Sequence, residues 1–221
     1  MEDRLVLLRM DRPFPAEEEK LLFDCVDSEK RRQLARITHR QAQQEHLAGA
    51  VLVRLLAGEQ VKTPPWELRL SATAAGKPFL PGHPDVHFNL SHTRGGILCG
   101  FSGRPVGVDI EALRPVSGRV AARWFSPAEQ GWAGQDPARR LTLWTRKEAA
   151  AKWAGRGLLS FGAKDTLSGE WLSRIVSGQR GEFVWSACGS RFCPAVIVCW
   201  QWEYFMDRVH FAAHALPGDK E

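Results

Sequence analysis

The 221-residue sequence predicts an α+β protein made of two similar lobes that meet near residue 105. The first observation behind this is the order of the expected elements, because strand, helices and strands follow one another twice along the chain. The second is composition, since 44% hydrophobic and 25% charged residues are typical of a folded protein with a sizeable core. We therefore expect an N-terminal lobe over residues 1–104 and a C-terminal lobe over residues 105–221.

The N-terminal lobe is expected to begin with a strand at Leu5–Met10, followed by a short helix with an acidic first turn after Pro15. A second helix starts at Ser28 in a basic stretch. Residues 41–57 have the apolar spacing of an amphipathic helix, which a Pro-Pro pair ends. Strand-like runs then cover residues 66–72, 86–92 and 96–102.

The C-terminal lobe is expected to begin with the strand PVGVDIEA, from Pro105. Two helices follow, one opening at Ser126 and the other at Asp136, each immediately before a proline, and the second runs to about Gly155. The remainder is rich in strand-forming residues. We expect strands at residues 170–176, 182–188, 195–203 and 208–215, with the last ending near Ala215.

Charge and cysteine usage narrow the class of protein. The net charge of +5 comes from 30 basic and 25 acidic residues that are interspersed, which favours anionic small molecules or acidic partners over nucleic acid. Five cysteines without a C-x-x-C pair, and an N-terminus unlike a signal peptide, indicate a reduced, cytoplasmic setting. No apolar run has the roughly 20 residues of a membrane span. Buried thiols are favoured over a zinc site at Cys188, Cys193 and Cys199 with His210 or His214, because the spacing is irregular.

The acidic strand residues Asp109 and Glu111 are the first candidates for chemistry. Residues two apart on a strand project from one face, so both carboxylates point the same way. In the second helix of this lobe, the apolar stripe through Leu141 and Trp144 continues to Glu148. A carboxylate on a buried stripe needs a compensating cation.

Two interpretations of these carboxylates compete. A D-x-E pattern is commonly an exposed strand face, and Glu148 with Lys152 is an ordinary i,i+4 ion pair. A divalent cation explains all three carboxylates together, because Mg²⁺ binds a few carboxylates and completes its shell with water and substrate phosphate. We therefore expect Asp109, Glu111 and Glu148 to bind Mg²⁺ or Mn²⁺, with Lys152 beside the phosphates as a fixed positive charge.

Two motifs, GVDIE from Gly107 and WTRKEAAAKWAGRGL from Trp144, resemble the signature pair of the surfactin-type 4′-phosphopantetheinyl transferases. The segment AGKPFLPGHPDVHFNLSHT, from Ala75 to Thr93, resembles the substrate-binding segment of that family, and SEKRRQLARI resembles its basic N-terminal helix. The similarity follows the same order through nearly the whole chain, with the C-terminal third matched loosely.

The resemblance implies transfer of the phosphopantetheine arm of coenzyme A to a serine of an acyl or peptidyl carrier protein, with release of adenosine 3′,5′-bisphosphate. It implies a role in polyketide, nonribosomal peptide or fatty acid biosynthesis, and two pseudo-symmetric lobes with the active site between them. By this resemblance, Asp109, Glu111 and Glu148 hold Mg²⁺ against the pyrophosphate, and Lys152 contacts the phosphates near the bond that breaks. Two lobes in one chain favour a monomer.

Other residues are implied as contacts of coenzyme A. On their own they are weak signals, because Gly-Lys-Pro is usually a turn and a histidine after a strand is usually an ordinary residue. The residues implied are Gly76, Lys77 and Pro78 at the adenine, Ser91 and His92 at the nucleotide and its phosphates, and Lys30 at the 3′-phosphate.

The 3′-phosphate position departs from the family pattern. The family commonly has a second basic residue three positions after Lys30, where this sequence has Gln33. The nearby Arg31, Arg32 and Arg36 are expected to substitute for it, unless the basic run is simply a solvated helix face.

The attacking serine needs a proton acceptor in phosphoryl transfer. Glu129 is a candidate, but Ser126-x-x-Glu129 is also a capping box, in which Glu129 only satisfies backbone donors. Glu148 or a metal-bound water are the alternative acceptors.

Two other functions fit parts of the sequence. Divalent-metal nucleases also gather Asp, Glu and Lys around a phosphodiester, but they commonly place Lys two residues after the second strand carboxylate, whereas Glu111 is followed by Ala112 and Leu113. A non-catalytic module that binds nucleic acid through residues 30–40 leaves Glu148 and the paired strand carboxylates unexplained.

Overall fold

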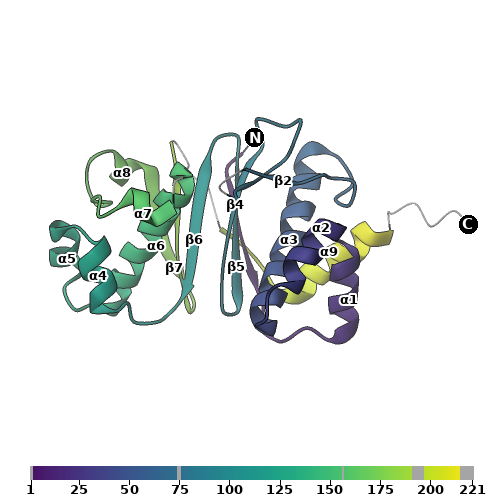
Figure 1. Cartoon of the computed structure of the whole chain (residues 1–221), viewed down its shortest axis with the longest axis horizontal. Coiled ribbons are helices and arrows are strands. Elements are labelled where there is room, and N and C mark those ends of the chain that lie inside the picture. Colours follow the sequence, from purple (N-terminus) through teal and green to yellow (C-terminus); the bar gives the residue numbers. More distant parts are fainter. Residues whose placement is uncertain (1, 74–75, 156, 191–196, 215–221) are drawn as a thin grey trace, which may run out of the picture.

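The computed structural model describes residues 2–73, 76–155, 157–190 and 197–214. Two sheets stand side by side in the middle of the molecule, with helices on the outer side of each (Figure 1). The chain is therefore a mixed α/β protein, in agreement with the expected order of its elements. No helix in these ranges is long and apolar enough to span a membrane.

The first sheet has the strand order β4-β5-β1-β9. Its first three strands pair in antiparallel fashion, whereas β9 joins β1 in parallel. Four helices pack their apolar sides on it to form the largest core (Figure 1). The strands are β1 (Arg4–Arg9), β4 (His87–Thr93), β5 (Gly96–Ser102) and β9 (Ile197–Trp200), and the helices are α1 (Ala16–Asp24), α2 (Ser28–Ala35), α3 (Arg40–Val61) and α9 (Trp202–His214).

The second sheet has the order β6-β8-β7, and both of its pairs are antiparallel. Its helices lie on the opposite side of the molecule from α1, α2 and α3 (Figure 1). The strands are β6 (Val106–Ala112), β7 (Ile175–Arg180) and β8 (Phe183–Gly189), and the helices are α4 (Gly118–Trp124), α5 (Pro127–Ala133), α6 (Pro137–Ala154), α7 (Gly157–Phe161) and α8 (Gly169–Arg174). A separate two-residue ladder joins β2 (Ser71–Ala72) and β3 (Pro78–Phe79).

Alternation along β1 divides its side chains between two cores. Val6 and Leu8 belong to the core beneath α3, whereas Leu5 and Leu7 pack with Val108 and its neighbours in the second sheet. Both faces of the strand are therefore buried. The two sheets share a continuous apolar contact, which fixes the position of β4 relative to β6.

Polar side chains of β4 bond directly to β6. The Asn89 side-chain oxygen accepts a hydrogen bond from the Val108 amide at 2.8 Å, and the Thr93 hydroxyl oxygen accepts one from the Ala112 amide at 3.0 Å. Ser91 lies between these two residues and on the same face, because side chains repeat every two residues along a strand. The polar side chains at alternate positions of the segment NLSHT thus join the first sheet to the second.

Helix α6 crosses β6 at Gly107, where the two backbones approach closely. A Cβ atom at this residue would lie 2.2 Å from the Ala149 carbonyl oxygen and 2.3 Å from the Trp153 amide nitrogen. Only glycine allows this approach. The contact brings Glu148 of α6 toward Asp109, which lies two residues further along β6.

The expected strand at residues 208–215 is wrong, because residues 208–214 belong to the helix α9, while Ala215 lies outside the described residues. The buried residues Trp202, Phe205, Met206 and Val209 recur at i, i+3, i+4 and i+7, which is the helical period. Their aromatic and branched side chains favoured a strand, but tertiary packing of this apolar stripe against α3 determines the conformation.

The expected strand at residues 195–203 is also shortened, because β9 covers Ile197–Trp200 and Trp202 and Glu203 begin α9, while residues 195–196 lie outside the described residues.

Two further expected strands are shorter than predicted. Residues 169–174 form the helix α8, so that only the end of the run at 170–176 is extended, in β7. Of residues 66–72, only Ser71 and Ala72 pair as a strand. Neither segment has the long row of paired backbone residues that keeps β5 and β8 extended over their whole length.

The boundary expected at residue 105 falls in the connection between β5 and β6. However, β9 pairs with β1, and α9 packs against α3. The end of the described chain therefore completes the sheet that the N-terminal residues begin, so the division between the two halves is not a single point in the sequence.

Candidate active site

The Asp109 carboxylate is the centre of a buried polar group formed by β4, β6 and α6. The Lys152 ammonium lies 2.7 Å from Asp109 Oδ1 and donates to the Ser91 hydroxyl oxygen at 2.9 Å. The Ser91 hydroxyl in turn donates to Asp109 Oδ1 at 2.8 Å. The structure thus brings together three of the residues expected at the site.

The second oxygen of Asp109, Oδ2, is buried and has no hydrogen-bond partner among the described residues. Burial raises the pKa of Asp109, although Lys152 and Ser91 act in the opposite direction. Leaving a buried polar atom unsatisfied costs about 1–3 kcal/mol, and more for a charged group. A divalent cation bound to Oδ2 would remove this cost, so Asp109 is suited to be a metal ligand.

Glu148 lies one helical turn before Lys152 and is half-buried. Burial, followed by the negative charges of Asp109 and Glu111, raises the pKa of Glu148, whereas Lys152 lowers it. The three expected metal ligands are therefore close enough to repel one another. Repulsion among carboxylates in a partly buried site favours the binding of a hard cation.

Glu111 makes a different set of contacts in this structure. Arg114 donates to both of its oxygens, at 3.0 and 2.6 Å, and the Trp144 indole donates at 3.0 Å. Within the described residues, no three Asp, Glu, His or Cys side chains are already arranged as the ligands of one metal ion. To share one cation with Asp109 and Glu148, as the sequence predicts, Glu111 would have to turn away from Arg114.

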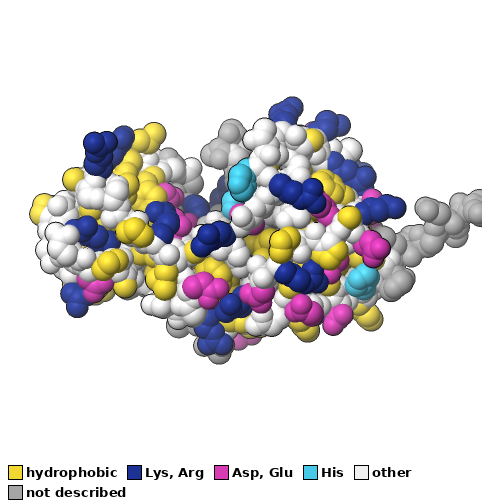
Figure 2. Space-filling model, turned by 90° about the horizontal axis from the view of Figure 1, so that it is seen from below, with side chains coloured by type: hydrophobic (Ala, Val, Ile, Leu, Met, Phe, Trp, Pro, Cys, Tyr) yellow, Lys and Arg dark blue, Asp and Glu magenta, His cyan; other side chains and the backbone are white. Residues whose placement is uncertain are grey.

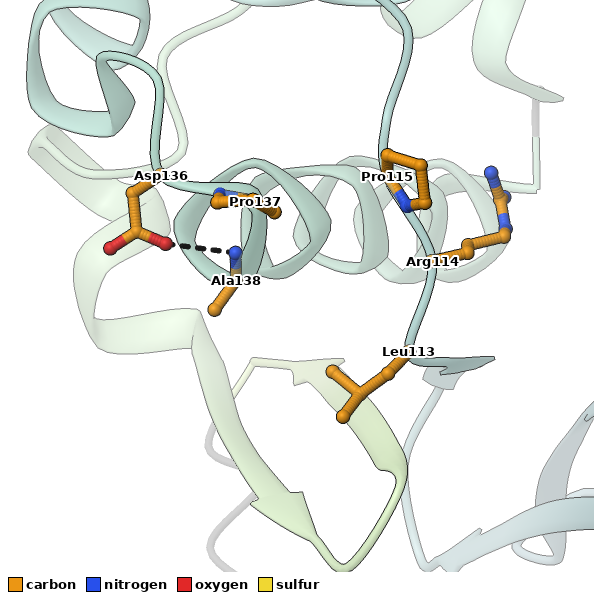
Figure 3. Close-up of a pocket in the computed structure, with 6 residues that line it drawn as sticks. All are labelled: Leu113, Arg114, Pro115, Asp136, Pro137 and Ala138. Carbon is orange, nitrogen blue, oxygen red and sulfur yellow. Dashed lines mark hydrogen bonds between the residues drawn. The ribbon is translucent and has the colours of Figure 1, made fainter.

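A pocket of about 430 Å³ lies beside this ion pair on the second half of the molecule. Figure 3 shows Leu113 and Pro115 across from Pro137 and Ala138 at the start of α6, where Asp136 caps the helix. The lining is largely apolar and includes none of the expected site residues. Arg114 both lines this pocket and holds Glu111, which links the pocket to the carboxylates.

The segment expected at the adenine lies against the start of β6. The Lys77 ammonium donates to the Val106 carbonyl at 3.3 Å, and burial lowers the pKa of Lys77. Gly76 has a φ of +78°, a conformation that favours glycine, and Pro78 opens β3. The Gly-Lys-Pro turn therefore places the Lys77 ammonium at the carbonyl of Val106, the residue that precedes Gly107.

His92 lies next to two residues that the sequence analysis did not select. Its ring meets the ring of His46 edge to face, with centroids 4.2 Å apart, and its Nδ1 lies 3.7 Å from Glu45. Burial, then the charges of His46, Lys152 and Lys30, lower the pKa of His92 to about 4. A polar Glu-His pair at the start of the apolar run LAGAVLV was the available signal.

Glu129 is fully buried and forms the expected capping box with Ser126. Its Oε2 also lies 2.6 Å from the ammonium of Lys147, which is equally buried. Its Oε1 accepts from the amide and the hydroxyl of Thr166, at 2.7 and 2.6 Å. The capping interpretation is confirmed, and a role as a base requires these contacts to break.

The described cysteines hold unpaired thiols. Cys25, Cys99 and Cys188 are buried, and burial raises the pKa of Cys188 to about 12. Of the residues considered for zinc, Cys193 lies outside the described residues, as does the side chain of His214.

Comparison with known proteins gives matches along most of the chain. A family model of the N-terminal part of 4′-phosphopantetheinyl transferases matches residues 12–99, and the model of the 4′-phosphopantetheinyl transferase superfamily matches residues 105–194. The 4′-phosphopantetheinyl transferase Sfp of Bacillus subtilis is 35% identical over 154 residues, which cover 67% of this chain and 69% of that protein.

More distant relatives carry related names. The 4′-phosphopantetheinyl transferase gsp of Aneurinibacillus migulanus is 29% identical over 62% of this chain and 59% of its own length. The L-aminoadipate-semialdehyde dehydrogenase-phosphopantetheinyl transferase of Xenopus laevis is 30% identical over 65% of this chain and 54% of its own length. Together with the buried acidic site, these matches show that the chain belongs to the Sfp-like 4′-phosphopantetheinyl transferases.

Proposed function

We propose that this phosphopantetheinyl transferase acts at the Asp109–Lys152 site, where it moves the 4′-phosphopantetheine arm of coenzyme A to a serine of an acyl or peptidyl carrier protein. The observation that carries the assignment is the buried Oδ2 of Asp109, which has no hydrogen-bond partner among the described residues. Asp109 lies near two further carboxylates and beside Lys152. This group combines a demand for a hard cation with a fixed positive charge, and the transfer of a phosphoryl group needs both.

In this proposal Asp109, Glu111 and Glu148 hold Mg²⁺. When bound, Mg²⁺ would neutralise charge on the pyrophosphate of coenzyme A. The oxygen ligands and their clustering suit Mg²⁺ or Mn²⁺ better than a softer metal. Membership of the transferase family favours this assignment over the nuclease and the nucleic-acid-binding module.

Lys152 is proposed to stabilise the departing phosphate. The serine oxygen forms a bond to the phosphorus that carries pantetheine, and the bond from that phosphorus to the bridging pyrophosphate oxygen breaks, releasing adenosine 3′,5′-bisphosphate. Negative charge grows on the departing oxygen as this bond breaks. Bonds to Asp109 and Ser91 restrict the Lys152 side chain, so its ammonium is held in place before the reaction.

The serine proton must leave as the new bond forms. Glu148 suits this role better than Glu129, because it is only half-buried and can be reached by a substrate hydroxyl. Glu129 has both oxygens occupied in the interior.

The nucleotide of coenzyme A is proposed to lie on the side of the active site that residues of the N-terminal half of the chain form. Lys77 and its flanking Gly76 and Pro78 would line the adenine, and Ser91 and His92 would approach the phosphates. β4 belongs to one sheet and β6 to the other. Such an arrangement supports an active site between two pseudo-symmetric lobes, over residues 1–104 and 105–221 with the C-terminal β9 and α9 joined to the first.

The enzyme is further proposed to act as a cytoplasmic monomer that binds neither nucleic acid nor membranes. A single chain supplies all of the proposed ligands, and the described cysteines are unpaired, which suits a reducing compartment. Size-exclusion chromatography with light scattering would contradict the monomer if the active protein eluted as a dimer.

Intact-mass measurement of an apo carrier protein tests the proposal. We expect a mass gain of one phosphopantetheine with wild-type enzyme, coenzyme A and Mg²⁺, and its loss with EDTA or with Glu148→Ala. Glu203→Ala, which removes an exposed carboxylate of α9, is the matched control and should retain activity. Full transfer in EDTA would refute the metal role, and full transfer by Glu148→Ala would refute the proposed site.

A further inference from the structure

We propose that Arg114 is a positioning residue, which holds Glu111 away from the other two carboxylates of the metal site and competes with the divalent cation for it. This inference rests on the proposed function, because it concerns the three carboxylates that are assigned there to Mg²⁺. It adds a residue outside this ligand set that determines how tightly the site binds its cation.

Most of the acceptor positions of Glu111 are already used. Arg114 donates to Oε2 through Nε at 3.0 Å and to Oε1 through Nη2 at 2.6 Å, and the Trp144 indole donates to Oε1 at 3.0 Å. A carboxylate has about four acceptor positions. In its present orientation Glu111 forms no metal-binding group with other acidic, histidine or cysteine side chains of the described residues. To bind one cation together with Asp109 and Glu148, Glu111 therefore has to leave Arg114.

The loop after β6 places Arg114 within reach of Glu111. Arg114 lies just beyond the end of this strand, and Figure 3 shows its side chain along α6, pointing away from Asp136 at the start of the helix. Trp144, the second donor, is on α6 one helical turn before Glu148. Glu111 is therefore held one turn of α6 away from a carboxylate with which it would share a cation.

The charges around Glu111 make Arg114 and a divalent cation alternative partners. Burial raises the pKa of Asp109 and of Glu148, and the negative charge of Glu111 adds to both shifts. The hydrogen bond to Glu111 raises the pKa of Arg114, against the effect of burial, and the charge of Asp109 adds to this rise. Arg114 thus compensates part of the negative charge that a divalent cation would compensate.

An ion pair of this kind is ordinary by itself. Figure 2 shows basic and acidic side chains mixed over one face of the molecule, and Arg139 pairs with Asp136 at the same spacing of three residues. The Arg114 side chain is 48% exposed, so its pair with Glu111 has the strength of a surface pair, a factor of at most about five in an equilibrium. Arg114 differs from Arg139 because its partner is a proposed metal ligand, so this factor appears in the affinity for the cation.

Titration with Mn²⁺, in which electron paramagnetic resonance measures the free ion, tests the competition without catalysis. We expect Arg114→Ala to bind Mn²⁺ about two- to fivefold more tightly than wild type, which corresponds to the loss of one exposed ion pair. Arg139→Ala is the matched control, because it removes a pair of the same spacing that includes no proposed ligand, and it should bind Mn²⁺ as wild type does.

Arg114→Lys separates the contact with Glu111 from the effect of charge alone. Lysine keeps the positive charge, but its single ammonium cannot hold both carboxylate oxygens in the fork geometry of arginine. We expect the Mn²⁺ affinity of this variant to lie between those of wild type and Arg114→Ala. Wild-type affinity in Arg114→Lys, with tighter binding only in Arg114→Ala, would mean that charge alone acts and would overturn the inference.

The indole of Trp144 reports the movement of Glu111 directly. The chain has nine tryptophans, so the Nε1–H signal of Trp144 in a nitrogen-15 NMR spectrum is identified by its loss in Trp144→Phe. We expect saturating Mg²⁺ to move the proton of this signal to lower chemical shift, because its hydrogen bond to Glu111 is lost. A signal that stays in place at saturating Mg²⁺ would count decisively against the proposed exchange of partners.

The proposed function and this inference can fail separately. Loss of Mn²⁺ binding in Glu148→Ala, with wild-type affinity in both Arg114 variants, would overturn the role of Arg114 and support the metal site. Absence of Mn²⁺ binding by the wild-type enzyme would refute the metal role in the proposed function, and the role of Arg114 with it.

Discussion

The buried pair of Glu129 and Lys147 gives the sharpest test of whether Glu129 is structural or catalytic. Both side chains are inaccessible to solvent, and their charged atoms lie 2.6 Å apart. Glu129→Gln keeps the shape and an acceptor for Thr166 but removes the charge that compensates Lys147. Breaking a buried ion pair from one side costs about 3–5 kcal/mol, because the remaining charge has no partner.

We therefore expect Glu129→Gln to lower the free energy of unfolding by about 3–5 kcal/mol. Lys147 keeps one further acceptor, the Lys164 carbonyl, which places the expected loss toward the lower end of that range. Urea denaturation followed by circular dichroism measures it. The double variant Glu129→Gln/Lys147→Met should be less destabilised than the sum of the single variants, since neither charge is then left alone.

Turnover distinguishes the two roles of Glu129. If the residue is structural, the folded fraction of Glu129→Gln at low temperature should transfer phosphopantetheine at a rate near that of wild type. A variant with wild-type stability, unchanged coenzyme A affinity and strongly reduced turnover would refute our reasoning and identify Glu129 as the proton acceptor.

Three further predictions follow from the packing and burial around the site. Gly107→Ala should destabilise the protein by more than about 1–3 kcal/mol, the usual cost of overpacking, because the Cβ would lie 2.2 Å from the Ala149 carbonyl oxygen. A melting temperature equal to that of wild type would contradict the close approach of α6 to β6. Asp109→Asn should abolish the thermal shift caused by Mg²⁺, measured by differential scanning fluorimetry, because the amide lacks the charge that a cation would compensate. A retained shift would exclude Asp109 as a ligand. Iodoacetamide at pH 8 should label Cys25 and Cys188 only after unfolding, because burial raises the pKa of both thiols to about 12. Peptide mass spectrometry measures the labelling, and rapid labelling of the native protein would contradict the burial of these thiols.

The core of the site could be predicted from sequence because its pattern is local. Asp109 and Glu111 lie two apart on a strand, and Glu148 and Lys152 lie four apart on a helix with a regular apolar stripe. The periods of 2 and 3.6 residues determine which side chains share a face. The sequence therefore predicts these pairs without any tertiary contact, and β6 and α6 have nearly the expected bounds.

Contacts made across the fold could not be predicted in this way. The Arg114 side chain that holds Glu111 is only three residues away, but whether it turns toward Glu111 depends on the loop at Pro115 and on Trp144. His46 and His92 are far apart in sequence, and no period relates them. The helix α9 could not be predicted for the same reason, because packing against α3, rather than its own β-branched and aromatic residues, determines its conformation.

The bonds between β4 and β6 show why a site of this kind depends on both sheets. Ser91 contacts Asp109 and Lys152 at once, so one hydroxyl from the first sheet contacts a carboxylate of the second sheet and an ammonium of α6. Asn89 and Thr93 hold the same two strands on either side of it. A change that loosens either bond would displace Ser91 before it altered the carboxylates, because α6 and Gly107 fix those independently. The proposed nucleotide side of the site is therefore expected to be more sensitive to the contact between the sheets than the proposed metal side.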